Sequence, residues 1–223
     1  MKKKYITNSG ETPRMFSNNI LEALSKVHFT VPIIIYVPVI TFYSYKALAG
    51  AGTGWQLFMA LFAAGIFLWS LTEYVIHRFI FHFQPRSGWG KRLHFIFHGV
   101  HHDYPKDAKR LVMPPSVSIP LAFFFYWFYG LFVQPSFLYA LFAGLVTGYL
   151  LYDMIHYAIH HLHIKNRFWK KVQRHHAIHH YQDETKGFGV SSSLWDKVFD
   201  TNFKKNGSRT VAVQELKGDD FFN

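Results

Sequence analysis

YDMIHYAIHH, residues 152–161, ends a long apolar segment and carries two histidines four residues apart, His156 and His160. Side chains four residues apart share one face of a helix, so both imidazoles point the same way if the helix continues past the apolar segment. Three further stretches also contain closely spaced histidines: HRFIFH at 77–82, HGVHH at 98–102 and HAIHH at 176–180. With HYAIH at 156–160 taken as the first cluster, the four clusters contain ten of the 15 histidines. Histidine is the commonest side-chain ligand of transition metals, and ten in this arrangement suit two metal ions better than one.

The four clusters supply the candidate metal ligands, and most of them have helical spacing. In each HxxHH stretch the first histidine lies three and four residues before the other two, which suits one side of a helix. His77 and His82 are five residues apart, so we expect a widened turn or a helix end there. The candidate ligands are His77, His82, His98, His101, His102, His156, His160, His176, His179 and His180.

Carboxylates near these histidines are candidates to orient the imidazole rings, because a ligand histidine usually donates its second N–H to an acceptor. Asp153 and Asp103, each within a few residues of a cluster, are the main candidates for this role, and Glu73 and Asp183 are further ones. We expect no catalytic residue separate from the metal ligands. Five histidines are left outside the ligand set, because a lone histidine is more often a surface or hydrogen-bonded residue: His28, His94, His161, His163 and His175.

The apolar residues, half of the 223, are bunched into runs long enough to span a membrane. A spanning helix needs about 20 apolar residues. The predicted spans are 29–49, 55–76, 116–133 and 137–155, and short turns at 50–54 and 134–136 join them into two hairpins. Gly144 and Gly148 have a spacing that permits close helix packing. The predicted fold is therefore an all-α integral membrane protein with four transmembrane helices.

The domain organisation follows from these spans. Residues 1–28 are predicted to form a cytosolic or interfacial segment, with a short amphipathic piece around 20–27. Residues 29–223 form a single membrane domain, in which the polar segments 77–115 and 156–223 build a helical cap that holds the histidine-rich dimetal site.

Charge predicts the orientation of the chain. All but one of the 24 Lys and Arg residues lie in segments 1–28, 77–115 and 156–223, and the exception is Lys46. By the positive-inside rule these three segments face the cytosol, which puts all four histidine clusters on one side of the membrane. We expect an active site on the cytosolic face of a bacterial inner membrane or, in a eukaryote, of the endoplasmic reticulum. In so apolar a chain, the net charge of +11 favours anionic lipid head groups over nucleic acid.

The chain has no cysteine, so thiolate metal sites and disulfides are excluded and a metal must be held by nitrogen or oxygen ligands. The start, MKKKYITNSGETPRMF, does not have the pattern of a secretory signal. The middles of the four predicted spans have no ionisable side chain, whereas a transporter usually places such groups there.

These motifs resemble the fatty acid hydroxylase superfamily, which includes sterol desaturase-type oxidases. The resemblance is carried by HRFIFH, HFIFHGVHH, YDMIHYAIHH and RHHAIHH, and it extends from about Glu73 to Thr201. HGVHHDYPKDAKRLVMPP (98–115) and GFGVSSSLWDKVFDT (187–201) favour the catalytic domain of fatty acid 2-hydroxylases.

The resemblance implies a membrane diiron monooxygenase that hydroxylates C2 of a fatty acid, or of a sphingolipid or ceramide acyl chain, with O2 as co-substrate. Carried over residue by residue, the ten candidate histidines would hold two iron ions. Zinc can occupy such a site but has no redox chemistry. Several eukaryotic members carry a fused cytochrome b5-like domain as electron donor. Only about 28 residues precede the first predicted span here, so a separate electron-donor protein is expected.

Other functions stay open at this point. The histidine clusters are shared by superfamily members that oxidise a sterol, a carotenoid or an alkyl chain. A non-catalytic membrane metal-binding protein is a further alternative.

Overall fold

The computed structural model describes residues 6–7 and 9–203, and within them the chain is helical, without a strand. The ends of the predicted N-terminal segment and cap, 1–5 and 204–223, lie outside the described residues, as does residue 8. The helices labelled α, and three π-helical turns labelled η, follow one another in this order: α1 (Asn19–Leu24), α2 (Thr30–Tyr45), η1 (Lys46–Gly50), α3 (Trp55–Val75), η2 (Ile76–Phe81), α4 (Gly88–His94), η3 (Phe95–Gly99), α5 (Val100–Asp103), α6 (Pro115–Gly130), α7 (Pro135–His161), α8 (Arg167–Tyr181) and α9 (Leu194–Val198).

Three helices in the described part are long and apolar enough to cross a membrane: Thr30–Gly50, Trp55–Phe81 and Pro135–His161. The second and third run further than the predicted spans 55–76 and 137–155, and the extra turns carry histidines, as expected. The predicted span 116–133 is not confirmed, because α6 has 16 residues. At 1.5 Å per residue it is about 24 Å long, less than the roughly 30 Å hydrocarbon thickness.

The long helices pack closely where glycines remove side chains. A Cβ at Gly65 of α3 would lie 2.1 Å from the Leu141 carbonyl oxygen of α7. A Cβ at Gly144 of α7 would lie 2.0 Å from the Phe62 carbonyl oxygen, and one at Gly148 would meet the Trp69 side chain at 2.6 Å. The close packing predicted from Gly144 and Gly148 is thus confirmed, and it fixes α3 against α7.

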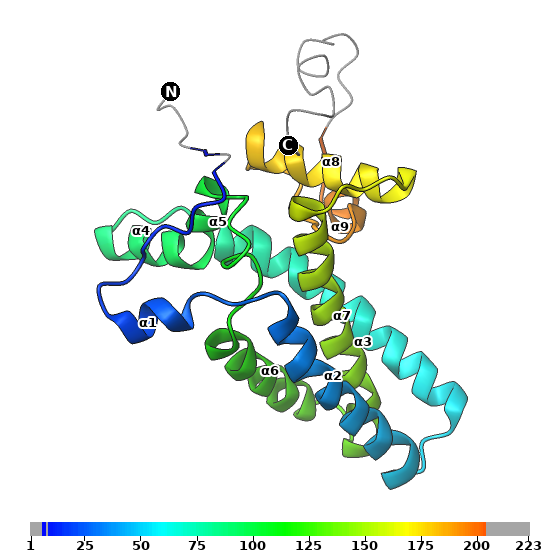
Figure 1. Ribbon diagram of the computed structural model, residues 1–223. Helices are drawn as coiled ribbons and strands as arrows, with labels where there is room; N and C mark the ends of the chain where they lie inside the picture. Colours follow the sequence, from blue (N-terminus) through cyan, green and yellow to red (C-terminus); the bar gives the residue numbers. More distant parts are fainter. Residues whose placement is uncertain (1–5, 8, 204–223) are drawn as a thin grey trace.

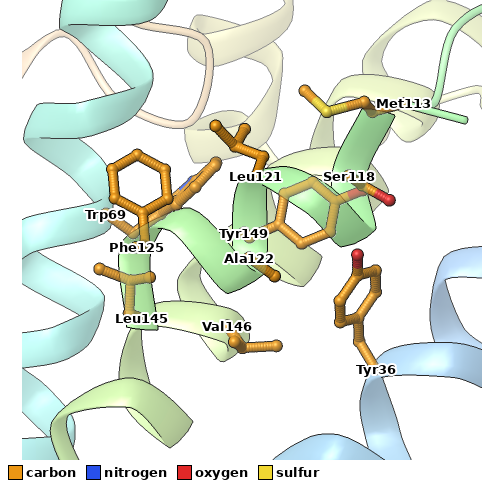
Figure 2. A pocket seen from close by; sticks show the side chains of 10 residues that line it. All are labelled: Tyr36, Trp69, Met113, Ser118, Leu121, Ala122, Phe125, Leu145, Val146 and Tyr149. Atoms are coloured by element: carbon orange, nitrogen blue, oxygen red, sulfur yellow. The ribbon is translucent and has the colours of Figure 1, made fainter. Parts of the chain in front are cut away.

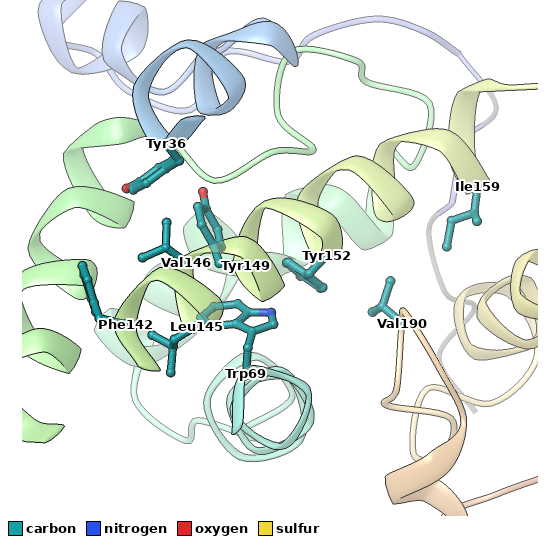
Figure 3. Packing of buried hydrophobic residues seen from close by; sticks show 9 residues of the cluster. All are labelled: Tyr36, Trp69, Phe142, Leu145, Val146, Tyr149, Tyr152, Ile159 and Val190. Atoms are coloured by element: carbon teal, nitrogen blue, oxygen red, sulfur yellow. The ribbon is translucent and has the colours of Figure 1, made fainter. Parts of the chain in front are cut away.

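A pocket lies among α2, α3, α6 and α7, and its lining is mostly apolar, with Tyr36, Ser118 and Tyr149 adding hydroxyls (Figure 2). The main core surrounds it: Trp69 of α3 packs edge-on against Tyr149 of α7, as does Tyr36 of α2 (Figure 3). The core continues along α7 to Ile159 and Val190, so it links the long helices to the histidine-bearing end.

The turn between η1 and α3 and the turn between α6 and α7 lie at one end of the bundle (Figure 1). The short helices α4, α5, α8 and α9 lie at the other end. At the turn end, the Thr53 hydroxyl donates to the Ser136 carbonyl at 3.4 Å, and Ala47, Phe58 and Ala140 form a small core. The polar segments that follow α3 and α7 therefore lie together at the other end of the bundle.

The N-terminal segment is bound to the connector that follows α5. The Val27 N–H donates to the Lys109 carbonyl at 2.8 Å, and the buried Arg110 guanidinium lies 2.6 Å from the Glu22 carboxylate. The amphipathic piece predicted around 20–27 is α1, whose Ile20 and Leu24 are exposed while Glu22 points inward. The apolar face of α1 is therefore exposed, and the interfacial position of this segment stays a prediction.

Candidate metal centre

The ten predicted ligand histidines come together in two adjacent groups of five. Group A contains His77, His82, His98, His102 and His179, and group B contains His101, His156, His160, His176 and His180. Within each group the five nitrogen atoms lie within 4.8 Å of one another. Eight of the ten side chains are buried, and His82 and His160 are partly exposed. The groups adjoin, since the rings of His102 and His180 stack with their centroids 4.2 Å apart.

Group A is built from the two π-helical turns η2 and η3, the end of α5 and one residue of α8. The His82 N–H donates to the His77 carbonyl at 3.1 Å, a five-residue step that confirms the predicted widened turn. This step brings the two Nε2 atoms within 3.2 Å. His98 Nε2 lies 3.1, 3.2 and 3.0 Å from Nε2 of the following partners, in order: His77, His82 and His102.

Group B is built from regular α-helix. His156 and His160 lie one turn apart near the end of α7, and His176 and His180 one turn apart on α8. His176 Nε2 lies 3.0, 2.9 and 3.0 Å from Nε2 of three partners, in order: His156, His160 and His180. Asn166 caps α8 through its side-chain oxygen, which accepts the Phe168 N–H at 2.8 Å and helps to start this helix.

Each HxxHH stretch divides its histidines between the two groups. His98 and His102, four apart, serve group A, while His101 serves group B. His176 and His180 serve group B, while His179 serves group A. Neighbouring residues on a helix diverge by about 100°, so the middle histidine of each stretch points to the other group. The spacing predicted that these side chains share a helix side, but it did not predict this exchange.

The short nitrogen contacts fit a bound cation and do not fit hydrogen bonds alone. A neutral imidazole nitrogen is either a donor or an acceptor, so His176 Nε2 can make at most one of its three contacts by donating its single hydrogen. Metal–nitrogen distances are about 2.1 Å, which separates two nitrogens at right angles around one ion by about 3.0 Å. The donor set therefore fits two transition-metal ions, one in each group.

Burial keeps these imidazoles in the neutral form that binds metal. It lowers the pKa of His98 and of His101 well below the ordinary histidine value, and neighbouring histidines lower both further. Burial and neighbouring histidines have the same effect on the pKa of His176 and of His180. The lone pairs are thus available at neutral pH in both groups.

Two group A rings are oriented by main-chain carbonyls of one loop, residues 186–191. His77 Nδ1 lies 2.5 Å from the Phe188 oxygen, and His179 Nδ1 lies 2.6 Å from the Lys186 oxygen. A carbonyl only accepts, so both Nδ1 atoms carry the hydrogen and Nε2 is left with its lone pair. The Glu184 carboxylate lies 4.0 Å from Nδ1 of a third group A ring, His102.

Two of the predicted carboxylates, Glu73 and Asp153, are buried and contact different parts of the chain. Glu73 is buried on α3 and accepts the Val190 and Ser191 N–H groups of the 186–191 loop, each at 2.8 Å. Asp153 is buried on α7 beside Tyr149 and the main chain of Met113.

The other two predicted carboxylates lie at helix ends. Asp103 is half-buried at the end of α5, and its carbonyl accepts the Thr7 N–H at 3.0 Å. Asp183 follows α8 and accepts from the main chain and hydroxyl of Thr185. That Asp153 and Asp103 orient ligand rings stays a prediction.

Sequence reasoning missed Asp196, which is fully buried on α9 and binds the same loop as Glu73. Asp196 lies within the segment 187–201, whose sequence indicated the family resemblance but no role for this residue. The five histidines left outside the ligand set belong to neither group. One of them, His175, has Nε2 3.1 Å from Asp196 Oδ2.

Comparison with known proteins agrees with this site. Residues 62–201 match the family model described as fatty acid hydroxylase. The chain is 38% identical to the dihydroceramide fatty acyl 2-hydroxylase FAH1 of Arabidopsis thaliana, over 86% of this chain and 80% of that protein. It is 37% identical to the ceramide very long chain fatty acid hydroxylase SCS7 of Saccharomyces cerevisiae, over 90% of this chain and 54% of that protein.

A solved structure also resembles the chain. The full-length scs7p structure, in which only the hydroxylase domain is visible, superposes with a TM-score of 0.80 at 37% identity. The superposition covers 86% of this chain and 73% of the other. Fold, histidine-rich centre and sequence therefore agree, and the chain belongs to the fatty acid hydroxylase family.

Proposed function

We propose that the protein is an O2-dependent membrane hydroxylase that adds a hydroxyl group to C2 of a fatty acyl chain. The observation that carries this proposal is the pair of five-histidine groups at the polar end of an apolar helix bundle. The names of the relatives supply the substrate class, since they refer to dihydroceramide acyl chains, ceramides or fatty acids. An acyl chain, free or within a sphingolipid, is thus the proposed substrate.

The ten histidines of groups A and B are the proposed ligands of two iron ions. When bound, iron supplies the redox chemistry with O2 that C–H hydroxylation needs and that amino-acid side chains lack. Imidazole nitrogen suits iron and zinc alike, but zinc has no redox chemistry, so zinc in the same place would give an inactive protein.

The pocket of Figure 2 is the proposed place for part of the acyl chain. Tyr149 lines it and lies seven residues before the group B histidine His156 on α7, about 10 Å along the helix. Phe125 of α6 also lines it, whereas Phe123 and Trp127 are exposed on the outside of the bundle. The apolar walls would exclude water from the alkyl chain, and the helix would align it with the histidines.

We further propose the predicted topology. In it α6 crosses the membrane with α7 as a second hairpin, and α4, α5, α8 and α9 form a cytosolic cap within one domain from residue 29 onward. The distribution of Lys and Arg supports this orientation. The exposed aromatic side chains of α6, such as Phe123 and Trp127, support contact with lipid.

Hydroxylation converts a C–H bond, O2, two electrons and two protons into C–OH and water, so electrons must be delivered. The chain has no cysteine to hold an iron–sulfur cluster. We propose that a separate protein donates the electrons. The outward face of α8 is the proposed binding surface for this donor. Four basic side chains are exposed on it, opposite the histidines: Arg167, Lys170, Lys171 and Arg174.

The test is to express the chain in a host that lacks 2-hydroxy lipids and to profile the lipids by mass spectrometry. New 2-hydroxyacyl species should form with the wild-type chain and not with His176→Ala. Metal-loaded protein that yields none of them, even with a supplied reductant, would refute the proposal. Hydroxylated sterols, carotenoids or alkanes in their place would favour another reaction of the superfamily.

A further inference from the structure

We infer that Asp196 and Glu73 are positioning residues for one metal only, that of group A, and that the two metal sites therefore differ in affinity. Neither carboxylate belongs to a histidine group. Both act through the 186–191 loop, whose carbonyls hold His77 and His179. The inference rests on the proposed role of groups A and B as metal sites.

The first step is the effect of the loop on the ligands. Phe188 and Lys186 accept the Nδ1 hydrogens of His77 and His179, at 2.5 and 2.6 Å. Such a contact fixes the tautomer and the ring orientation and makes Nε2 more basic. Losing a partner of this kind typically weakens metal binding by about 10–100-fold. Both histidines belong to group A, so the loop acts on that group.

The second step is that Asp196 holds the loop in this position. Its carboxylate accepts the Phe188 N–H at 2.8 Å and the Gly189 N–H at 2.9 Å. It is anchored in turn by the Thr201 hydroxyl at 2.8 Å and by His175 at 3.1 Å. Burial alone would raise the pKa of Asp196, but these hydrogen bonds hold that pKa below its ordinary value, so it stays an acceptor at neutral pH.

The third step is that Glu73 holds the other end of the loop. One Glu73 oxygen accepts the N–H groups of Val190 and Ser191, and the other oxygen accepts the Ser191 hydroxyl. Glu73 lies on α3, four residues before His77, so one helix carries both the ligand and the anchor of the loop that orients it. The loop cannot relax freely between these two carboxylates.

Group B has a different environment. Within the described residues, Nδ1 of His156 and Nδ1 of His176 are buried and have no hydrogen-bond partner. These two rings are held by their places on α7 and α8 and by packing. The asymmetry favours tighter metal binding in group A, so group A should fill first when metal is scarce.

Zinc binding tests this without any catalytic turnover. Purified metal-free protein is titrated with zinc against a chromophoric chelator in two backgrounds, His176→Ala, which keeps group A complete, and His98→Ala, which keeps group B complete. Asp196→Asn replaces one acceptor oxygen by an NH2 group that faces an N–H donor. It should weaken zinc binding about 10–100-fold in the His176→Ala background and leave it unchanged in the His98→Ala background.

Two further variants separate positioning from general destabilisation. Glu73→Gln keeps an oxygen for the two N–H groups and should bind zinc nearly as the parent does, whereas Glu73→Ala should weaken group A. Asp200→Asn removes the same charge at an exposed position four residues from Asp196 and should change neither group.

The outcomes are distinct. The inference would be overturned if Asp196→Asn weakened zinc binding equally in both groups, or in neither. The proposed metal sites would stand in either case. If neither background binds zinc, the proposed metal sites themselves fail. The asymmetry would also be overturned if group A, in His176→Ala, and group B, in His98→Ala, bound zinc with equal affinity.

Discussion

Groups A and B have the same composition but are held by different means. Each contains two histidine pairs and one histidine from the other HxxHH stretch. In group B both pairs are one turn apart on α7 and α8, so regular helix geometry aims them. In group A one pair spans a π-helical turn, and His82 lies just past its end with φ −97° and ψ 16°. The comparison teaches that group A depends on a contact from outside its own helices, since carbonyls of the 186–191 loop hold His77 of the π-helical turn and His179 of α8.

The two groups are also related by the order of the chain. A long apolar helix carries the first pair of each, at His77 and His82 for group A and at His156 and His160 for group B. A later helical segment with an HxxHH stretch then carries the second pair. In both halves, the middle histidine of the HxxHH stretch joins the opposite group.

The largest expected effect comes from removing the central histidine of either group. His98→Ala in group A and His176→Ala in group B each remove the nitrogen that contacts three others. Because both metals are proposed to act together, each variant should lose activity by more than about 100-fold, beyond the loss expected from removing a residue that only orients a ligand. Elemental analysis should find one metal ion instead of two. Full occupancy in either variant would contradict the ligand assignment.

An intermediate effect should come from Gly187→Ala, which strains only the loop beside group A. Gly187 has φ +72°, and a Cβ there would lie 2.4 Å from the Phe203 ring. Alanine in this left-handed conformation costs roughly 1–2 kcal/mol before any clash. Zinc affinity of group A should fall about tenfold, and that of group B should not change.

Gly52→Ala is the matched control for that strain. Gly52 also has a positive φ, +64°, but it lies in the turn at the opposite end of the bundle, where a Cβ would have no neighbouring atom within 4 Å. The substitution should leave zinc binding by both groups unchanged. A fall in group B affinity with Gly187→Ala, or in either group with Gly52→Ala, would argue for general loosening of the fold.

The smallest effect concerns pH, where the two groups should behave alike. Burial lowers the pKa of His98 and of His176 well below 6.5, the value expected in the unfolded chain. Below that pH the unfolded chain binds protons that the folded metal-free protein does not, so stability falls as pH falls. The melting temperature of metal-free protein should be lower at about pH 5.5 than at about pH 7.5. His98→Ala and His176→Ala should weaken this dependence equally, and a clear difference between them would show that the groups are not equally desolvated.

Local spacing was enough to predict the parts of the centre that depend on one segment. The five-residue step from His77 to His82 indicated a widened turn, and the structure has a π-helical turn there. The position of His156 and His160 after an apolar run indicated a helix that continues past it, and α7 does so. Helical periodicity and hydropathy act over a few residues, so they can be read directly from the chain.

Contacts between distant segments could not be predicted in this way. Asp196 binds the loop at 188–189 from α9, and Glu73 binds it from a helix more than 110 residues earlier. No periodicity connects such residues. The length of α6 was also missed, because hydropathy does not indicate where a helix ends, and α6 is flanked by Pro114 and Leu131.

The sequence by itself determined the helical class, the apolar runs and the ten histidines at helical spacing, because these depend on composition and local geometry. The tertiary structure alone decided which histidine joins which group. That assignment depends on how the α4–α5 segment and α8 cross the ends of α3 and α7, which directs His101 and His179 to opposite groups. It also placed Asp196 and Glu73 behind group A, since a carboxylate can orient a loop only where packing brings the two together.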